Sequence, residues 1–351
     1  MTSRRRFLHQ SSLIAAATTV WADGLAANTP PAGTPRPAVR PRRLRPGDTV
    51  GLVSPSGVTW EPVRLEIARE SLAAMGLRSK VAANATARHG YLAGTDAERA
   101  ADLNAMFADP EVAAIHCIRG GWGCARLLPL IDWDVVAANP KALTGYSDIT
   151  GLLLPLQART GLVGFHGPNA DSKWNAFNAG WFRRVVLDGE AVTFENVRET
   201  GEYLAVTENR VQTITPGRAR GRLLGGNLTV LTALVGTPFL PDWDGCVLFV
   251  EDVEEAPYRI DRMLVQLKLA GILQKARAVI WGTCADCDPG EGFGSLTITD
   301  VLNDHVKPLG VPAWQGAMIG HVDRQFTLPI GVEVEVDAAA GTIRMIEPGV
   351  V

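Results

Sequence analysis

The chain has 351 residues, of which 46% are hydrophobic and 20% are charged, an ordinary composition for a globular protein large enough for two domains. Its formal net charge is −3 and no long basic run occurs in the folded part, which argues against a nucleic-acid partner. The five cysteines are an odd number spread along the chain, which is not the pattern of a disulfide framework.

The first residues have the features of an export signal. Consecutive arginines, Arg4-Arg5-Arg6, are followed by Phe-Leu and by a short, weakly apolar stretch over 11–27. A charged start, a short apolar region and a small-residue exit predict a secretory signal, and the arginines are typical of the twin-arginine route. The stretch is too short and too rich in Ala, Thr and Ser to be a membrane anchor. We expect residues 1–27 to be cleaved and the mature protein to be periplasmic, with no membrane association.

Residues 28–44 differ in composition from everything that follows. They contain five prolines among Gly, Ala and Arg residues, and they end in a basic cluster. This composition predicts an extended, solvated linker with little capacity to bury side chains. We interpret the basic cluster as part of this tether and not as a binding patch.

An alternation of strands and helices begins at Asp48. The apolar runs and their spacing predict, in chain order, a strand over 49–53, a helix over 60–76, a helix over 97–107, a strand over 113–118, a strand over 142–144 and a helix over 149–158. Such alternation is typical of an α/β layer with a mainly parallel sheet. We assign residues 45–190 to a first α/β domain.

The pattern changes near residue 190, where Thr and Val runs interrupted by Gly and Pro become more β-like. Beyond them the sequence predicts a helix over 227–234, a strand over 246–250, a helix over 258–270, a strand over 276–281 and a terminal hairpin over 332–346. We assign residues 200–351 to a second α/β domain. No internal repeat is visible in the sequence.

The first candidate for chemistry is Ser147, which lies between a predicted strand and a predicted helix. Gly145 precedes it by two residues, as in a sharp turn that exposes a hydroxyl. Such a turn leaves backbone N–H groups at the helix start, where they can hold a developing oxyanion. The usual nucleophile elbow also has glycine two residues after the serine, but this chain has Ile149. From these residues alone, a nucleophile and a helix-capping serine are both open.

The second candidate is the glycine-rich segment 119–123, which follows a strand and precedes a helix predicted over 125–131. Three glycines in four residues allow the backbone to approach a ligand closely. One reading is a phosphate cradle, but no Lys-Ser/Thr pair follows, which argues against a P-loop. The segment either supplies an N–H group to an oxyanion or is a plain tight turn.

Acidic and histidine side chains complete the set of candidates. Glu251 and Asp252 end an apolar strand, the position where open α/β sheets bind ligands. A serine needs a base, and a histidine base is usually oriented by a carboxylate. Spacing does not choose among the histidines that lie beyond the signal, which are His89, His116, His166, His305 and His321.

Cys284 and Cys287 have a spacing found in zinc sites. No second cysteine pair or histidine pair lies at ligand spacing in the sequence, which argues against a metal. After export the two thiols can form a small disulfide, and they can equally remain reduced.

Several motifs together resemble the LD-carboxypeptidases and the related microcin-immunity peptidases. They cover about residues 44–346 in order, and they are Gly-Tyr-Ser-Asp at 145–148, the segments at 118–123 and 126–129, Phe-His-Gly-Pro at 165–168, Gly-Gly-Asn-Leu at 225–228, Glu-Asp at 251–252 with 257–262, and Gly-His at 320–321 with 328–331. Trp122 stands where the family usually has tyrosine.

The resemblance implies that Ser147 is the nucleophile, that His321 is the general base and acid, and that Glu251 orients His321. Backbone N–H groups of Asp148 and of Gly120 or Gly121 would hold the oxyanion. It also implies a flavodoxin-like N-terminal domain, a C-terminal domain of swivelling type and a homodimer, and it implies no metal or organic cofactor.

Three further site assignments stay open beside this reading. Asp252 can replace Glu251 as the orienting group, and residues 258–262 either clamp a substrate carboxylate or form solvated ion pairs. His166 is expected to be a pocket or core residue.

The resemblance points to a short peptide substrate. The expected activity is release of terminal D-alanine from a murein tetrapeptide, at a bond from an L-centre to a D-residue. The alternatives are an amidase of microcin-immunity type that acts on peptidyl- or aminoacyl-nucleotides, and an exported peptide-binding protein without catalysis.

Overall fold

The computed structural model describes residues 36–289 and 294–351. The predicted signal over 1–27 and the first part of the predicted linker lie outside these residues. Within the described ranges, no helix has the length and apolar character needed to cross a membrane.

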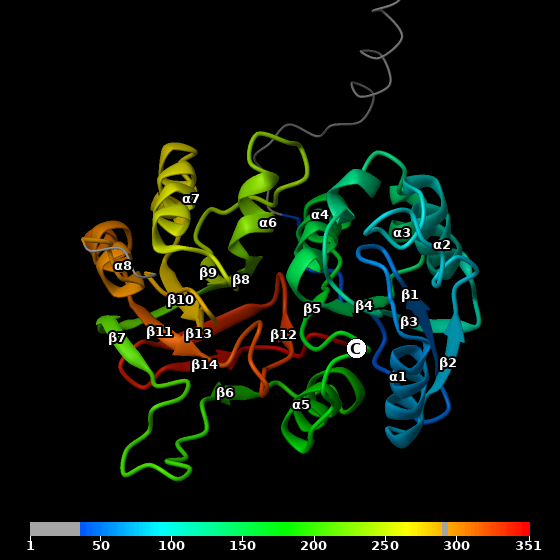
Figure 1. Cartoon of the computed structure of the whole chain (residues 1–351), viewed down its shortest axis with the longest axis horizontal. Helices are drawn as coiled ribbons and strands as arrows, with labels where there is room; N and C mark the ends of the chain where they lie inside the picture. Colours follow the sequence, from blue (N-terminus) through cyan, green and yellow to red (C-terminus); the bar gives the residue numbers. More distant parts are fainter. Residues whose placement is uncertain (1–35, 290–293) are drawn as a thin grey trace, which may run out of the picture. The chain divides into compact units, whose positions relative to one another are not determined.

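The first sheet has six strands (Figure 1). In spatial order they are β12 (Leu328–Pro329), β5 (Phe165–His166), β4 (Ala142–Gly145), β3 (Val112–Cys117), β1 (Thr49–Val53) and β2 (Arg78–Val81). All neighbours are parallel except the pair β12–β5. The order β2-β1-β3-β4-β5 is that of flavodoxin-like sheets, in which ligands bind beyond the carboxyl ends of the strands at the β1/β3 switch point. The expected flavodoxin-like fold is confirmed.

Helices cover both faces of this sheet (Figure 1). Helices α2 (Asp96–Ala108), α3 (Trp133–Ala138) and α4 (Thr150–Thr160) lie on one side, and α1 (Pro62–Ala74) and α5 (Ala176–Phe182) lie on the other. Shorter helical turns are η1 (Cys124–Leu127), η2 (Ser147–Ile149) and η3 (Arg183–Leu187). Helix α2 begins with a capping box, in which Thr95 and Glu98 satisfy each other's free N–H groups.

The second sheet has eight strands with a parallel centre. In spatial order they are β6 (Thr193–Glu195), β14 (Thr342–Met345), β13 (Glu333–Asp337), β8 (Arg218–Asn227), β9 (Val247–Glu251), β10 (Ala278–Gly282), β11 (Ala313–Ala317) and β7 (Gln212–Thr215). Strands β8 to β11 are parallel, and the outer strands are antiparallel. The hairpin predicted over 332–346 is the pair β13–β14. Strand β9 is buried along its whole length, as expected for a central parallel strand.

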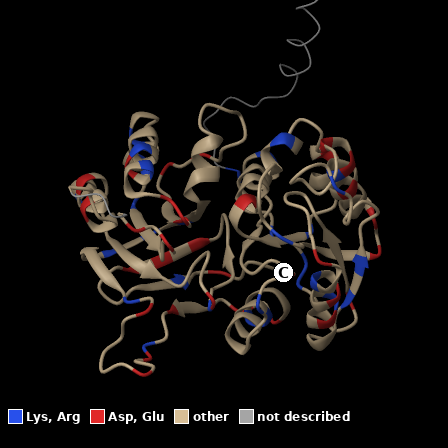
Figure 2. Cartoon of the chain, in the orientation of Figure 1, with Lys and Arg blue, Asp and Glu red and all other residues tan. Residues whose placement is uncertain are grey.

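Helices α6 (Leu228–Ala233), α7 (Pro257–Leu269) and α8 (Ile298–His305) lie side by side against this sheet (Figure 1). The short turns η4 (Leu273–Lys275) and η5 (Lys307–Leu309) follow α7 and α8. Helix α7 starts at a proline and buries Ile260, Met263, Leu264 and Leu267, whose i, i+3, i+4, i+7 spacing makes one apolar face. Basic and acidic residues are interspersed over the described ribbon (Figure 2).

The second sheet's half of the chain also contributes to the first sheet. Strand β12 pairs antiparallel with β5, through Leu328 opposite His166 and Pro329 opposite Phe165. This crossing directly follows the segment that contains His321. The last residues return to the start of the described chain, where the Val351 N–H group donates to the Pro41 carbonyl.

Residues 36–44 differ from the expected solvated tether. The Val39 N–H group donates to the Gly161 carbonyl at 2.8 Å, and Val39 accepts from Val163 at 2.9 Å. Leu44 is only 2% exposed. Proline-rich composition predicts an extended backbone correctly, but an extended backbone can dock along a folded surface when its N–H groups find partners there.

Two local expectations near the site are also corrected or completed. The helix predicted over 125–131 is only the short turn η1, because Pro129 has no N–H group to continue a helix.

Cys284 and Cys287 form a disulfide, so the pairing that the sequence left open is made in the structure. Cys117, Cys124 and Cys246 are free and buried.

Candidate active site

Ser147 stands on a sharp turn between β4 and α4. Its φ of 66° places a non-glycine residue in the left-handed region, a strained conformation that is often found at functional turns. A side chain at Gly145 would press on Ile149, whose Cγ1 atom would lie 2.9 Å from the added Cβ. Ile149 therefore occupies the space that Gly145 leaves, which explains how this turn accommodates isoleucine where the usual elbow has glycine.

His321 connects this turn to the second sheet. Its Nε2 atom lies 3.2 Å from Ser147 Oγ, and its Nδ1 atom lies 2.8 Å from Glu251 Oε2. Gly320, directly before it, has a φ of 84°, and a Cβ atom there would collide with the Glu251 carboxylate. The approach of His321 to Glu251 thus requires glycine at position 320.

Glu251 is fully buried at the end of β9. Burial opposes its charged form, but the hydrogen bond and charge of His321 outweigh burial and hold the pKa of Glu251 below its ordinary value. In the same way burial would lower the pKa of His321, but the hydrogen bond and charge of Glu251 outweigh it and raise that pKa above 6.5. The pair therefore stabilises a positive charge on the imidazole next to Ser147.

The neighbouring acid, Asp252, has other hydrogen-bond partners than His321. Its carboxylate accepts from Asn227 Nδ2 at 3.0 Å and from the hydroxyl of Thr229 at 2.8 Å. Burial is the main cause that raises the pKa of Asp252 to about 6. Of the two acids that the sequence left open, Glu251 is the one that contacts His321.

The other histidines have different surroundings. His166 is fully buried behind the site, between the rings of Tyr146 and Phe249, and burial lowers its pKa to about 4. His116 is buried against the Pro168 carbonyl, and its pKa is also lowered to about 4, by burial. His305 contacts Asp261 at 2.5 Å, between α8 and α7. His166 is thus a core residue, as expected.

The glycine turn after β3 lies against Ser147. A Cβ atom on Gly120 would be 2.8 Å from Ser147 Cβ, so only glycine lets the two backbones come this close. Among the hydrogen bonds of the described residues, none is donated by the backbone N–H groups of Gly120, Gly121 or Asp148. These three groups remain available at the position where the sequence reasoning placed an oxyanion site.

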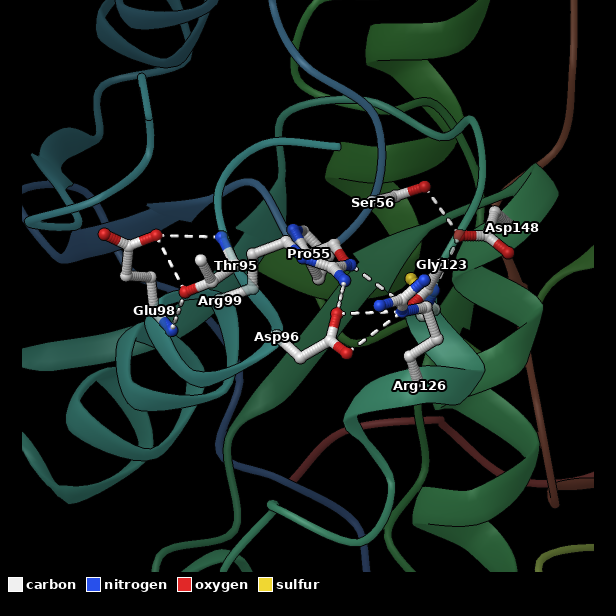
Figure 3. A network of polar contacts seen from close by, with 10 residues as sticks. Pro55, Ser56, Thr95, Asp96, Glu98, Arg99, Gly123, Arg126 and Asp148 are labelled. Atoms are coloured by element: carbon white, nitrogen blue, oxygen red, sulfur yellow. Dashed lines mark hydrogen bonds and ion pairs between the residues drawn. The ribbon is translucent and has the colours of Figure 1, made fainter. Parts of the chain in front are cut away.

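The Asp148 side chain has a different task from its backbone. It is 4% exposed and accepts from Ser56 Oγ at 2.6 Å and from the Cys124 N–H group at 2.9 Å (Figure 3). Burial raises the pKa of this carboxyl despite both bonds. Asp148 thereby ties the serine turn to the turns that follow β1 and β3.

A buried arginine extends this network (Figure 3). Arg99 is 1% exposed, and its guanidinium donates to the carbonyls of Pro55 and Gly123 and to the Asp96 carboxylate. The Arg126 Nε atom donates to both oxygens of the same Asp96 carboxylate, at 2.9 and 3.0 Å. The two turns that frame Ser147 are therefore held by charge-assisted bonds to one helix, α2.

Ser147 and His321 open onto a cleft of about 800 Å³ between the two sheets. Its walls carry charges of both signs. The basic side chains are Arg64, Arg119, Lys173 and Arg259, and the acidic ones are Asp171, Asp252, Glu254, Glu255 and Asp323. The cleft therefore suits a short ligand that carries both carboxylate and amino groups.

Sequence reasoning missed several residues of this cleft. The Tyr146 ring meets the His321 ring edge-on, with centroids 4.9 Å apart, and the Tyr146 N–H group donates to Asn169 Oδ1 at 3.2 Å. The Asp171 Oδ2 atom lies 4.0 Å from Arg64 Nη1. Asn169 and Asp171 closely follow β5, so their position beyond a strand end was the available signal.

In the segment 258–262, which the sequence left open as a clamp for a substrate carboxylate, Arg259 lines the cleft. Its guanidinium is paired with the Glu255 carboxylate at 3.4 Å. Arg262 stacks over Tyr258, with 6.0 Å between the guanidinium carbon and the ring centroid.

Within residues 36–289 and 294–351, no group of three or more His, Cys, Asp or Glu side chains is arranged to hold a metal ion.

A strained serine bonded to a histidine whose second ring nitrogen meets a buried carboxylate is the arrangement of a serine hydrolase. The sequence matches the LD-carboxypeptidase N-terminal domain over residues 50–167 and the LD-carboxypeptidase C-terminal domain over 220–336. The chain belongs to the LD-carboxypeptidase family and is a serine-type carboxypeptidase.

Its relatives include enzymes named for murein peptides. It is 38% identical to the "Probable murein peptide carboxypeptidase" of Bacillus subtilis, over 89% of this chain and 95% of the relative. It is 31% identical to the murein tetrapeptide carboxypeptidase of Pseudomonas aeruginosa, over 80% and 91%. A solved structure of the microcin C7 self-immunity protein MccF, without ligand, superposes with a TM-score of 0.80 and 26% identity, over 89% of this chain and all of that one.

Proposed function

We propose that this protein is an exported LD-carboxypeptidase that releases terminal D-alanine from a murein tetrapeptide through an acyl-enzyme on Ser147. The observation that carries the proposal is the hydrogen-bonded series Ser147–His321–Glu251 at the cleft. The three residues come from different strand ends and meet only in the fold. Their distances are within the reach that nucleophile, base and orienting group need.

In this mechanism, His321 Nε2 removes the proton of Ser147 as Oγ attacks the scissile carbonyl carbon. The negative oxygen of the tetrahedral intermediate is held by the backbone N–H groups of Asp148 and of Gly120 or Gly121. The intermediate collapses to an ester on Ser147, and His321 gives its proton to the departing amino group of D-alanine. Water, deprotonated by His321, then cleaves the ester and restores the serine.

Glu251 stabilises the imidazolium that forms in both steps. Its low pKa keeps it ionised, so its negative charge is present when His321 becomes positive. The Tyr146 ring against His321 limits the rotation of the imidazole. The pair therefore enters the reaction already oriented.

The substrate assignment rests on the relatives' names and on the charges of the cleft. A murein tetrapeptide carries several carboxylates and an amino group. Arg64, Arg119 and Lys173 offer positive partners for the carboxylates, and Glu254 offers a negative partner for the amino group. A cleft of about 800 Å³ accommodates a peptide of this size.

The export of this enzyme and its homodimer are parts of the same proposal. The twin-arginine pattern in residues 1–27 supports a periplasmic location, next to the murein. Cell fractionation of the full chain, compared with a variant in which Arg5 and Arg6 are both changed to lysine, tests export. Light scattering on the mature protein tests the dimer.

The decisive experiment is release of free D-alanine from the murein tetrapeptide by the mature protein and by Ser147→Ala. We expect release by the wild type and a loss of about 10⁴-fold or more in the variant. Equal release from both would exclude Ser147 as the nucleophile. No release from a folded wild type would exclude this substrate.

A second candidate is hydrolysis of a peptidyl- or aminoacyl-nucleotide. A structure of the microcin C7 self-immunity protein, to which this fold is similar, is a complex with aspartyl sulfamoyl adenosine, in which an aminoacyl group is joined to a nucleoside. Trp122 favours this candidate, because this side chain lines the cleft, is 61% exposed and offers a surface on which a base can stack. Turnover of an aminoacyl-nucleotide in the absence of D-alanine release would support this candidate. Binding of either compound without turnover would instead indicate a peptide-binding protein.

A further inference from the structure

The Cys284–Cys287 disulfide lies in the loop after β10. This strand runs between β9, which ends at Glu251, and β11, which leads to His321. Gly282, the last residue of β10, is tightly packed: a Cβ atom there would be 3.0 Å from Glu251 Cβ and 3.1 Å from the Ile319 carbonyl oxygen. The disulfide loop thus starts in direct contact with the strand ends that carry Glu251 and His321.

The same loop is bonded to one wall of the cleft. The Glu254 N–H group donates to the Ala285 carbonyl at 2.9 Å, and Val253 pairs with Ala285 in an isolated parallel bridge. Ala285 lies between the two bonded cysteines. Val253, Glu254 and Glu255 all line the cleft. The disulfide loop is therefore the neighbour against which this wall of the cleft is hydrogen-bonded.

Both sides of this contact have a strained backbone. Glu254 has a φ of 55° and Asp286 has a φ of 54°, and both are non-glycine residues in the left-handed region. Such conformations persist only where the surroundings hold them. Around Asp286 the constraint is covalent, because the disulfide joins the residues that enclose it.

We propose that the Cys284–Cys287 disulfide is a positioning element for substrate binding. It holds the Ala285 carbonyl where Glu254 can bond to it, and it thereby fixes the acidic wall formed by residues 253–255. Only the activity assay below rests on the proposed function. Opening the bond requires a dithiol reductant, which supplies two electrons and two protons, so that the S–S bond becomes two thiols and the reductant becomes a cyclic disulfide.

Cys284 is partly exposed and Cys287 is 6% exposed, so we expect a reductant to reach the disulfide through Cys284 under native conditions. Cys117, Cys124 and Cys246 are buried. Burial is the main cause that raises the pKa of Cys246 to about 12, and it also raises the pKa of Cys117 and Cys124. Mild reduction followed by alkylation should therefore label two sites per chain, a result that mass spectrometry verifies.

The first test is hydrogen exchange in the oxidised and the reduced wild type. With the carbonyl of Ala285 released, exchange at the Glu254 amide should become about five- to tenfold faster, the effect of losing one ordinary hydrogen bond. The amides of β9 serve as the internal control and should not change. Unchanged exchange at Glu254 after verified reduction would overturn the proposal, and this measurement needs no substrate.

The second test is the kinetics of D-alanine release. Reduction should raise KM about three- to tenfold while kcat stays within about twofold, because the bonds of Ser147, His321 and Glu251 are not touched. The double variant Cys284→Ser/Cys287→Ser should have the raised KM and should not respond to the reductant. An unchanged KM in the reduced wild type would contradict the proposal.

The two tests separate this proposal from the proposed function. If the oxidised wild type releases no D-alanine, the substrate assignment fails, and hydrogen exchange still decides whether the disulfide holds the wall. If the double variant does not fold, the reduced wild type carries both measurements.

Discussion

Ser147 and His321 meet from two sheets that position them by different means. On the first sheet the backbone does the positioning: Ser147 is in a left-handed conformation, Gly120 packs against it, and the Asp148 network anchors its turn. On the second sheet a buried charge does it: Glu251 is fully buried, and its Oε2 atom is paired with His321 Nδ1. A site built in this way separates the geometry of the nucleophile from the electrostatics of the base.

This difference predicts how each half responds to change. The half that Glu251 controls should respond strongly to charge and to pH, because an unpaired charge in a buried site is costly. The half that the backbone controls should respond to changes of shape and should tolerate the loss of a single hydrogen bond.

The largest effect is expected for Glu251→Gln, which keeps the shape of the side chain and removes its charge. We expect kcat for D-alanine release to fall about 10⁴-fold, because the imidazolium loses its counter-charge and the histidine its oriented tautomer. Asp252→Asn is the matched control, since Asp252 is the adjacent buried acid and does not contact His321. Equal losses in the two variants would remove Glu251 from its proposed role.

The next largest effect is expected for Gly320→Ala. The added methyl would collide with Glu251, so His321 has to move, and we expect a loss of about 100-fold in kcat/KM. Gly310→Ala is the control, because Gly310 also has a positive φ, 68°, but a Cβ atom added there would have no neighbouring atom within 4 Å. Both variants carry similar backbone strain, so the difference in their activities measures the collision. A similar activity in both would show that His321 does not need its present position.

The pH profile of kcat/KM should show the charge of Glu251 directly. His321 acts as a base only when neutral, and its pKa is raised, so the acidic limb of the profile should have its midpoint above pH 6.5. Activity is lost as pH falls through that value. In Glu251→Gln burial still lowers the pKa of His321, and the two largest causes that raise it, the hydrogen bond and the charge of Glu251, are lost. The charges of Asp252 and Glu254 still raise this pKa but are smaller causes, so the midpoint should move to lower pH. If the midpoint of the acidic limb does not move in this variant, a group other than His321 controls that limb.

The smallest effect is expected for Ser56→Ala on the first sheet's side. It removes the 2.6 Å bond to Asp148, and we expect the free energy of unfolding to fall by about 1–3 kcal/mol while kcat changes less than about threefold. Ser54→Ala is the matched control, because its buried hydroxyl donates to a neutral carbonyl, that of Ala85, at 2.7 Å. Urea denaturation of the two variants compares their free energies of unfolding. A loss of kcat as large as that of Glu251→Gln would contradict the backbone-based positioning of Ser147.

The sequence was sufficient where the signal is local. The strand–turn–helix around Ser147, the buried run that ends at Glu251 and the apolar face of α7 all appear as short-range patterns, and each is present in the fold. Propensity and periodicity act over a few residues, so such elements can be predicted without knowing what packs on them. The resemblance to a family then selected His321 among the histidines, a choice that spacing alone did not allow.

Long-range contacts decided the rest. Ser147 and His321 are 174 positions apart, and only the packing of two sheets brings their atoms to 3.2 Å. Residues 36–44 resembled a free tether because their docking depends on partners at Gly161 and Val163. The need for glycine at position 320 could likewise not be predicted, because the atom with which a side chain there would collide belongs to Glu251, far away in the sequence. The sequence by itself thus determined which residues can do the chemistry, and the tertiary structure decided which of them meet, because burial and collision are properties of neighbours in space.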